Sequence, residues 1–233
     1  MTVRREGSAS IEQPGHWWYR ARADLLEAAL AGFATDTTLV LDVGSADEPS
    51  VPWLRGEQHV TVDVDPRGLH PGEGVCASAM SLPFRDATFD LVSAFDVVEH
   101  CEPEAAAVAE LARVLRPGGR LLLSVPAYQW AWSDHDVRAG HHRRYTRPRL
   151  VAAVEAEGFV VLRATYGFAA VFPLFAAERL TRRVRRPAAA KLPEPSPAVE
   201  RMLIGLSRVE RRWLRHHDAP FGSSVFLAAD KPV

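Results

Sequence analysis

One stretch, residues 38–65, constrains the fold of this chain more than any other. It opens with an apolar run at residues 39–43, which ends at Gly44. A short apolar run bounded by turn residues is typical of a strand buried on both faces of a parallel sheet. A second run, residues 59–64, carries Asp63 near its end. Two such strands, a turn of small residues and an acid predict a nucleoside-type site at the carboxyl ends of a parallel sheet.

The turn after the first strand limits which ligand could bind there. A dinucleotide fingerprint needs glycine at positions 44, 46 and 49, and the chain has Gly44, Ala46 and Pro49. The glycines that let the backbone approach a pyrophosphate are missing, and so is a P-loop lysine. We therefore expect a nucleoside-bearing ligand without a phosphate chain, and a nicotinamide oxidoreductase is disfavoured. Pro49 suits the first turn of a helix, so we expect one there.

Strand-like and helix-like segments alternate along the rest of the chain. This alternation predicts an α/β fold with a parallel sheet covered by helices on both faces. Further strands are expected at residues 74–76, 89–95, 120–125, 159–166 and 223–231. Helices are expected at residues 16–30, 103–115, 146–157 and 196–217.

Composition and charge exclude several classes of protein. The 233 residues, 47% of them hydrophobic, suit one globular domain with an elaboration. The net charge of −1 gives no general attraction for nucleic acid. Because we find no signal-peptide core and no apolar run of ~18 residues, we expect a cytoplasmic protein. Cys76 and Cys101 have no metal or redox spacing and are expected to be buried thiols.

A long block, residues 81–126, is the most specific signal in the sequence. It reads LPFRDATFDLVSAFDVVEH from Leu82 and ELARVLRPGGRLLLSVP from Glu110. The block resembles the middle of class I S-adenosylmethionine-dependent methyltransferases of the bacterial small-molecule type. In the family's first motif, acid-x-Gly stands here as Asp42 and Gly44. The resemblance covers residues 38–166 and the closing strand. It implies a doubly wound, Rossmann-like seven-stranded sheet with one antiparallel strand and a helical cap.

The resemblance also implies S-adenosylmethionine as cofactor and suggests which residues touch it. Gly44 and Ser45 would place backbone against its methionine part. Asp63 would hold the ribose, with Val64 against the adenine. The spacing from Gly44 to Asp63, about 20 residues, is one at which an acid accepts hydrogen bonds from both ribose hydroxyls.

Two further positions of the family pattern concern the adenine and the sulfonium. The acid that usually bonds the adenine amino group is replaced here by Ser78. That contact could fall to the Ser78 hydroxyl or to the Ala79 backbone. Phe95 and Asp96 would border the methionine and the sulfonium. Glu99, one helical step further, is interpreted as part of a structural helix start.

The first helix begins with an aromatic cluster, HWWY at residues 16–19. One interpretation is that these rings simply dock the helix on the sheet. The other is a lid over the cofactor, in which Arg20 or Arg22 would clamp a carboxylate with two hydrogen bonds. We include Arg22 among the cofactor-binding residues.

The loop at residues 127–145 lies where such enzymes build the pocket for the methyl acceptor. A hydroxyl acceptor needs a group that takes its proton, and histidine suits this role near neutral pH. His142 and His135 are our candidates, with Tyr145 orienting the acceptor.

Other interpretations of the same loop stay open. Arg143 and Arg144 could bind an acidic group of the acceptor. The loop could equally be a solvated connection. Its histidines and aspartates invite a zinc site, but their spacing fits no standard ligand set, so we expect no metal.

The segment before the last strand, residues 167–222, is unusually basic. Residues 179–217 hold eleven Arg or Lys against three Glu, a net charge of +8, so the rest of the chain carries −9. The helix at 196–217 is amphipathic. A lid over the sheet end and a surface that contacts anionic lipid, peripheral to a membrane, are both open. The expected apolar face is Val199, Met202, Leu203, Leu206, Val209 and Trp213.

We thus expect four regions: a lid at 1–37, a core at 38–166, a helical cap at 167–222 and the final strand at 223–233. The expected function is transfer of a methyl group from S-adenosylmethionine to a small-molecule or glycolipid-type acceptor. The alternative is a regulatory or scaffold protein that binds the cofactor without transferase activity. The loss of two motif glycines and Ser78 would suit that alternative.

Overall fold

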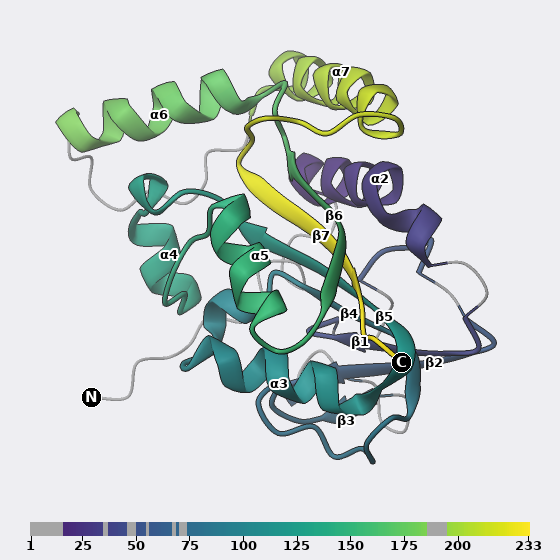
Figure 1. The fold of residues 1–233 in the computed structure, drawn as a ribbon. Coiled ribbons are helices and arrows are strands. Elements are labelled where there is room, and N and C mark those ends of the chain that lie inside the picture. The colour runs from purple at the N-terminus through teal and green to yellow at the C-terminus, as the bar shows by residue number, and fades with distance from the viewer. Residues whose placement is uncertain are drawn as a thin grey trace, which may run out of the picture.

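A single seven-stranded sheet forms the centre of the molecule, in the order β3-β2-β1-β4-β5-β7-β6 (Figure 1). The computed structural model describes residues 16–34, 37–45, 50–54, 56–66, 69, 74–185 and 195–233, without the side chains of 182–185. The described strands are β1 (Leu39–Val43), β2 (Gln58–Asp63), β3 (Gly74–Cys76), β4 (Phe89–Phe95), β5 (Leu115–Pro126), β6 (Val160–Gly167) and β7 (Ser224–Asp230).

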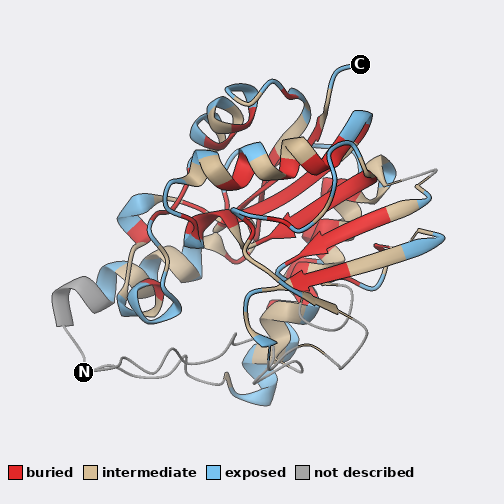
Figure 2. Ribbon diagram, turned by 90° about the horizontal axis from the view of Figure 1, so that it is seen from below, coloured by how far each residue is buried: buried red, intermediate tan, exposed pale blue. Residues whose placement is uncertain are grey.

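The pairing of these strands confirms the predicted fold class. β3, β2, β1, β4 and β5 are parallel to one another, and β7 lies antiparallel between β5 and β6. Every residue of β4 is buried, as expected for a central parallel strand covered on both faces. Figure 2 shows buried residues along the strands of the sheet.

Helices cover both faces of the sheet (Figure 1). Helix α2 packs with α7 on one face, while α3 and α5 lie against the other. Helix α6 extends from the end of β6 away from the sheet (Figure 1). The described helices are α2 (Trp17–Leu30), α3 (Glu104–Val114), α4 (Asp134–Ala139), α5 (Arg147–Glu155), α6 (Phe172–Arg185) and α7 (Pro197–Leu214), with 3-10 turns η1 (Ala31–Phe33), η3 (Val98–His100) and η4 (Gln129–Ala131).

Several element boundaries differ from the sequence prediction by a few residues, and one expected helix is not seen in the described residues. Helix α3 ends at Val114, but strand pairing begins at once with Leu115, and a register shift accommodates residues 116–119. The helix expected near Pro49 is not seen at residues 50–54, which form bends and turns; Pro49 itself lies outside the described residues.

The buried face of α7 also differs from the expected one. Helix α7 buries Leu203, Ser207, Glu210 and Leu214. Glu210 can be buried because its carboxylate accepts hydrogen bonds from the backbone N–H groups of Ala169 and Ala170, at 2.8 and 2.9 Å. As a result, much of the expected apolar face is exposed, namely Val199, Met202, Val209 and Trp213.

Two smaller findings concern the exterior. Cys76 is exposed, contrary to expectation, because β3 is an edge strand; Cys101 is buried as expected. No helix in the part of the chain that the structure describes is long and apolar enough to cross a membrane.

Candidate active site

The carboxyl ends of β1, β2 and β4 meet at one edge of the sheet. In register, Val43 of β1 pairs with Val62 of β2 and with Ala94 of β4. The residues that follow, among them Asp63 and Phe95, therefore lie side by side at this edge. Gly44 joins them through its backbone N–H, which donates to the Val62 carbonyl at 2.6 Å.

Gly44 has the conformation that a tight turn at this edge requires. Its φ is +78°, a region that side chains rarely adopt. A Cβ atom at Gly44 would lie 2.4 Å from the Val97 Cγ2 atom. Glycine therefore lets the first turn pack directly on the segment that follows β4.

Asp42, the acid of the first motif, supports the turn through hydrogen bonds inside the protein. It is fully buried and accepts hydrogen bonds of 2.6 Å from the Ser50 N–H, the Ser50 hydroxyl and the Ser93 hydroxyl. Burial raises the pKa of Asp42, against these hydrogen bonds, which lower it. The carboxylate of Asp42 thus holds Ser50 in place and links β1 to β4. Its effect on a bound ligand would be indirect, through the position of the turn. Ser45 is fixed locally, with its hydroxyl donating to the Asp42 carbonyl at 3.0 Å.

The second strand and the loop after β3 lie next to each other. Asp63 ends β2, half-buried, and one carboxylate oxygen accepts from the Asp65 N–H at 2.8 Å. The Asp63 carbonyl accepts from the Ala77 N–H at 3.0 Å, which brings Ser78 and Ala79 to the same side. The Ser78 hydroxyl accepts from the Met80 N–H, and Ala79 is buried. Val64 is exposed beside Asp63.

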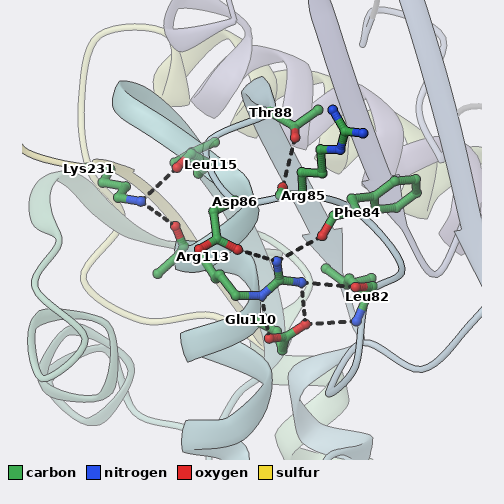
Figure 3. Close-up of polar contacts among 10 residues, drawn as sticks. Leu82, Phe84, Arg85, Asp86, Thr88, Glu110, Arg113, Leu115 and Lys231 are labelled. Carbon is green, nitrogen blue, oxygen red and sulfur yellow. Dashed lines mark hydrogen bonds and ion pairs between the residues drawn. The ribbon is translucent and has the colours of Figure 1, made fainter.

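The loop at residues 82–88 is held by one arginine of α3 (Figure 3). Arg113 donates to the carbonyls of Phe84 and Leu82 at 2.8 and 2.9 Å and pairs with Asp86 at 2.7 Å. Glu110 bonds Arg113 and also accepts from the Leu82 N–H at 2.8 Å. Glu110 and Arg113, which belong to the block that resembles the methyltransferase family, thus hold the 82–88 loop in place.

An ion pair joins the first helix to the end of β4. The Arg22 Nε atom lies 2.7 Å from an Asp96 carboxylate oxygen. The Ser124 hydroxyl donates to Asp96 at 3.1 Å, and the guanidinium of Arg22 lies 5.8 Å from the centre of the Phe95 ring. Asp96 has a φ of +59°. Here Arg22 forms an ion pair with a carboxylate of the protein itself, through one nitrogen, at the position where the sulfonium is expected.

Asp136 bonds several residues of the loop after β5. Arg144 binds it through two nitrogens at 2.7 and 3.1 Å, and the His141 Nδ1 atom lies 2.9 Å from it. The Ser133 N–H donates to it at 2.8 Å, which starts α4. Burial alone would raise the pKa of Asp136, but hydrogen bonds from His141 and Arg144 hold it well below its ordinary value.

Arg143 and Tyr145 are also engaged inside the protein. Arg143 donates to the Cys101 carbonyl at 2.5 Å and pairs with Glu102. The fully buried Tyr145 donates its hydroxyl to Glu104, and burial raises the pKa of the phenol. The contacts of both side chains thus stabilise the loop.

Glu99 is the unusual residue of this region. It is 0% exposed, and neither carboxylate oxygen has a hydrogen-bond partner among the residues that the structure describes. Burial, reinforced by the charge of Asp96, raises its pKa well above the ordinary value. The backbone carbonyl of Glu99 accepts from the His142 N–H at 2.7 Å, so the loop packs directly on η3.

Four histidines lie on η3 or in the 127–145 loop that packs against it. His100 lies beside His141, with ring centres 4.6 Å apart, and burial lowers the pKa of His100 to about 4. The ring centres of His135 and His141 are 6.3 Å apart, and burial lowers the pKa of His135. His142 is exposed.

The structure therefore gathers the expected cofactor residues at one sheet edge, and it places the expected acceptor loop against η3. Sequence reasoning missed the convergence of Glu99, His100 and His141. The adjacent acid and histidine directly after β4 were visible in the sequence. Their third neighbour comes from 41 positions further on and is brought there by the fold.

Comparison with known proteins agrees with this arrangement. A family model described as a methyltransferase domain matches residues 41–123. An uncharacterized methyltransferase of Mycolicibacterium gilvum is 30% identical over 184 residues, which cover 66% of this chain and 72% of the relative. Another from Mycobacterium sp. (strain JLS) is 33% identical over 153 residues, 56% of this chain and 61% of the relative.

A solved structure shows the same fold. It is phosphoethanolamine N-methyltransferase 2 of Haemonchus contortus in complex with S-adenosyl-L-methionine. Its TM-score is 0.56 at 16% identity, and the match covers 93% of this chain and 53% of that one. With this sheet order, this motif edge and a relative of 30% identity over most of its length, the chain belongs to the class I S-adenosylmethionine-dependent methyltransferases.

Proposed function

We propose that this methyltransferase acts on a small-molecule or glycolipid-type acceptor that binds between the 127–145 loop and the start of α6. The carrying observation is an aromatic cluster that bridges the two. The Tyr128 ring lies 5.9 Å from Trp130 and 5.5 Å from Phe172 of α6, and Phe172 lies 5.6 Å from Phe221. Trp130 and Phe221 are 36% and 43% exposed, so the cluster offers apolar surface to a ligand.

The edge residues fit the cofactor. When bound, S-adenosylmethionine supplies an electrophilic methyl group on its sulfonium. Asp63 would hold the ribose, and the Gly44 turn would place backbone against the methionine part. The carboxylate of Asp96, already held by Arg22, would face the sulfonium. Asp42, whose carboxylate accepts hydrogen bonds from Ser50 and Ser93, would support the turn.

The acceptor side contributes positioning. Methyl transfer requires an in-line approach of the acceptor atom, so holding the acceptor in place supplies much of the rate. An alkyl chain would lie on the aromatic cluster, and a polar head would point toward the sheet edge. His142 and His135 stay our candidates for the group that takes a proton from a hydroxyl. Arg143 and Arg144 are engaged with Glu102 and Asp136, which favours a structural role for both.

A contact with anionic membrane would suit a lipid-like acceptor. Helices α6 and α7 expose large apolar side chains, including Leu174, Leu180 and Met202. The same segment carries the excess of arginines. Protein should therefore sediment with anionic vesicles and be released by salt, because salt screens the attraction. Equal recovery with neutral vesicles would favour a lid without lipid contact.

The test of the proposed function combines binding with turnover. S-adenosylhomocysteine should bind, and S-adenosylmethionine should be consumed with lipid-like acceptors. Trp130→Ala should raise KM for these acceptors and leave cofactor affinity unchanged. The control is Val160→Ala, because Val160 is 55% exposed at the start of β6, at the sheet edge opposite the 127–145 loop. Binding without turnover on any acceptor would favour the regulatory or scaffold alternative.

A further inference from the structure

Three side chains from two separate segments converge beside the sheet edge. Glu99 and His100 come from η3, and His141 follows α4. One carboxylate oxygen and one nitrogen from each imidazole all lie within 4.8 Å of one another. A small inward movement of these side chains would bring the three atoms to the spacing of ligands around one metal ion.

The state of Glu99 gives the second, independent observation. Its carboxylate is completely buried and has no hydrogen-bond partner among the described residues. Buried carboxylates are usually hydrogen-bonded, paired with a cation or bound to a metal, because burial without a partner is costly. The loop supplies the His141 imidazole beside this carboxylate, and η3 supplies the His100 imidazole, whereas the Arg144 guanidinium is bound to Asp136.

His141 is oriented as metal-binding histidines are. Its Nδ1 atom lies 2.9 Å from an Asp136 oxygen, so its Nε2 atom is left to act as the ligand. Arg144 and the Ser133 N–H fix Asp136 in turn. A carboxylate behind a ligating histidine is the usual outer shell of such sites and fixes the ring and its tautomer.

We propose that Glu99, His100 and His141 bind a divalent transition-metal ion, preferentially zinc. Two imidazoles and one carboxylate match a common ligand set of catalytic zinc, whereas magnesium and calcium prefer oxygen ligands. Three protein ligands leave a coordination position open. An acceptor oxygen could bind there and be polarised beside the methyl donor; that role, unlike ion binding, rests on the proposed function.

The test measures zinc binding by the untagged full chain without cofactor. Metal-stripped protein competes with a chromophoric chelator for Zn²⁺, and one ion per chain is expected. Asp136→Asn should lower the affinity about 10–100-fold, the usual effect of removing an outer-shell partner. His141→Ala and Glu99→Gln should lower it further. His142→Ala is the matched control, because this exposed histidine adjoins His141 and should leave affinity unchanged.

Two additional measurements separate binding from folding and from methyl transfer. Each variant is checked for an unchanged melting temperature. His100→Ala replaces Glu99→Gln if the latter fails to fold, because His100 is the most exposed of the three residues. The site would be overturned if the wild-type protein takes up no zinc. It would also be overturned if the His141→Ala variant binds zinc as tightly as the wild type. S-adenosylhomocysteine titration reports on the methyltransferase site separately, so either proposal can fail alone.

Discussion

Two buried carboxylates at the same sheet edge differ in their hydrogen bonding. Asp42, at the end of β1, and Glu99, after β4, are both 0% exposed. Burial raises the pKa of each. Asp42 accepts hydrogen bonds from Ser50 and Ser93, whereas Glu99 has no such partner within the described ranges. A satisfied buried acid holds a fold together, and an unsatisfied one is a candidate for binding chemistry.

The largest expected difference concerns stability. Asp42→Ala removes the acceptor of three donors and should lower the free energy of unfolding by about 3 kcal/mol. Glu99→Gln, in metal-free protein, removes no hydrogen bond to the carboxylate among the described residues and should change it less, by about 1 kcal/mol. Denaturant melts measure both. Equal losses in the two variants would mean that the two carboxylates play the same structural role.

Gly44 tests the turn that Asp42 supports. Gly44→Ala places a Cβ 2.4 Å from Val97 at a φ of +78° and should cost about 2–4 kcal/mol. Gly140 is the matched control, because its φ is +77° and nothing lies within 4 Å of its Cβ position. Gly140→Ala should therefore cost only the backbone term, about 1–2 kcal/mol. If thermal unfolding shows the two variants to be alike, close packing of the turn on Val97 has no energetic weight.

Substitution of Asp63 tests whether the ends of β1 and β2 bind the cofactor. Asp63→Ala should weaken S-adenosylhomocysteine by about 1.5–3 kcal/mol, the scale of hydrogen bonds to a charged group. Glu99→Gln should leave the same affinity nearly unchanged. Isothermal titration calorimetry compares the two. Unaltered affinity in a folded Asp63→Ala protein would remove Asp63 from the cofactor site.

The smallest effect concerns a carboxylate whose pKa moves the other way. A hydrogen bond from Arg113 lowers the pKa of Glu110. Glu110 therefore stabilises the fold above its unfolded pKa of ~4.3, and this contribution is lost as pH falls through the lower folded pKa. Glu110→Gln should cost about 1 kcal/mol at neutral pH, and the cost should shrink below about pH 4. A cost that persists undiminished in acid would show that charge is not responsible.

The same contrast explains what the sequence could predict. The strands at 39–43 and 89–95 were predicted to the residue, because parallel strands buried on both faces read as mostly apolar runs. Gly44 and Asp63 could be found from spacing along the chain. These features depend on local sequence, and the family motifs preserve them.

What failed depends on contacts between distant segments. The apolar stripe of α7 did not reveal that Glu210 would be buried on the backbone of Ala169 and Ala170. Likewise, residue types alone could not show that Arg143 and Tyr145 contact Glu102 and Glu104, which lie just before α3 and at its first residue. The cluster of Glu99 with His141 escaped for the same reason.

A crystal structure grown with S-adenosylhomocysteine tests the assignment of this edge most directly. The ribose should lie on the carboxylate of Asp63, and the homocysteine part should lie between the Gly44 turn and Asp96. The thioether sulfur should face the 127–145 loop. A ligand bound elsewhere, or a ribose that does not contact Asp63, would contradict the account.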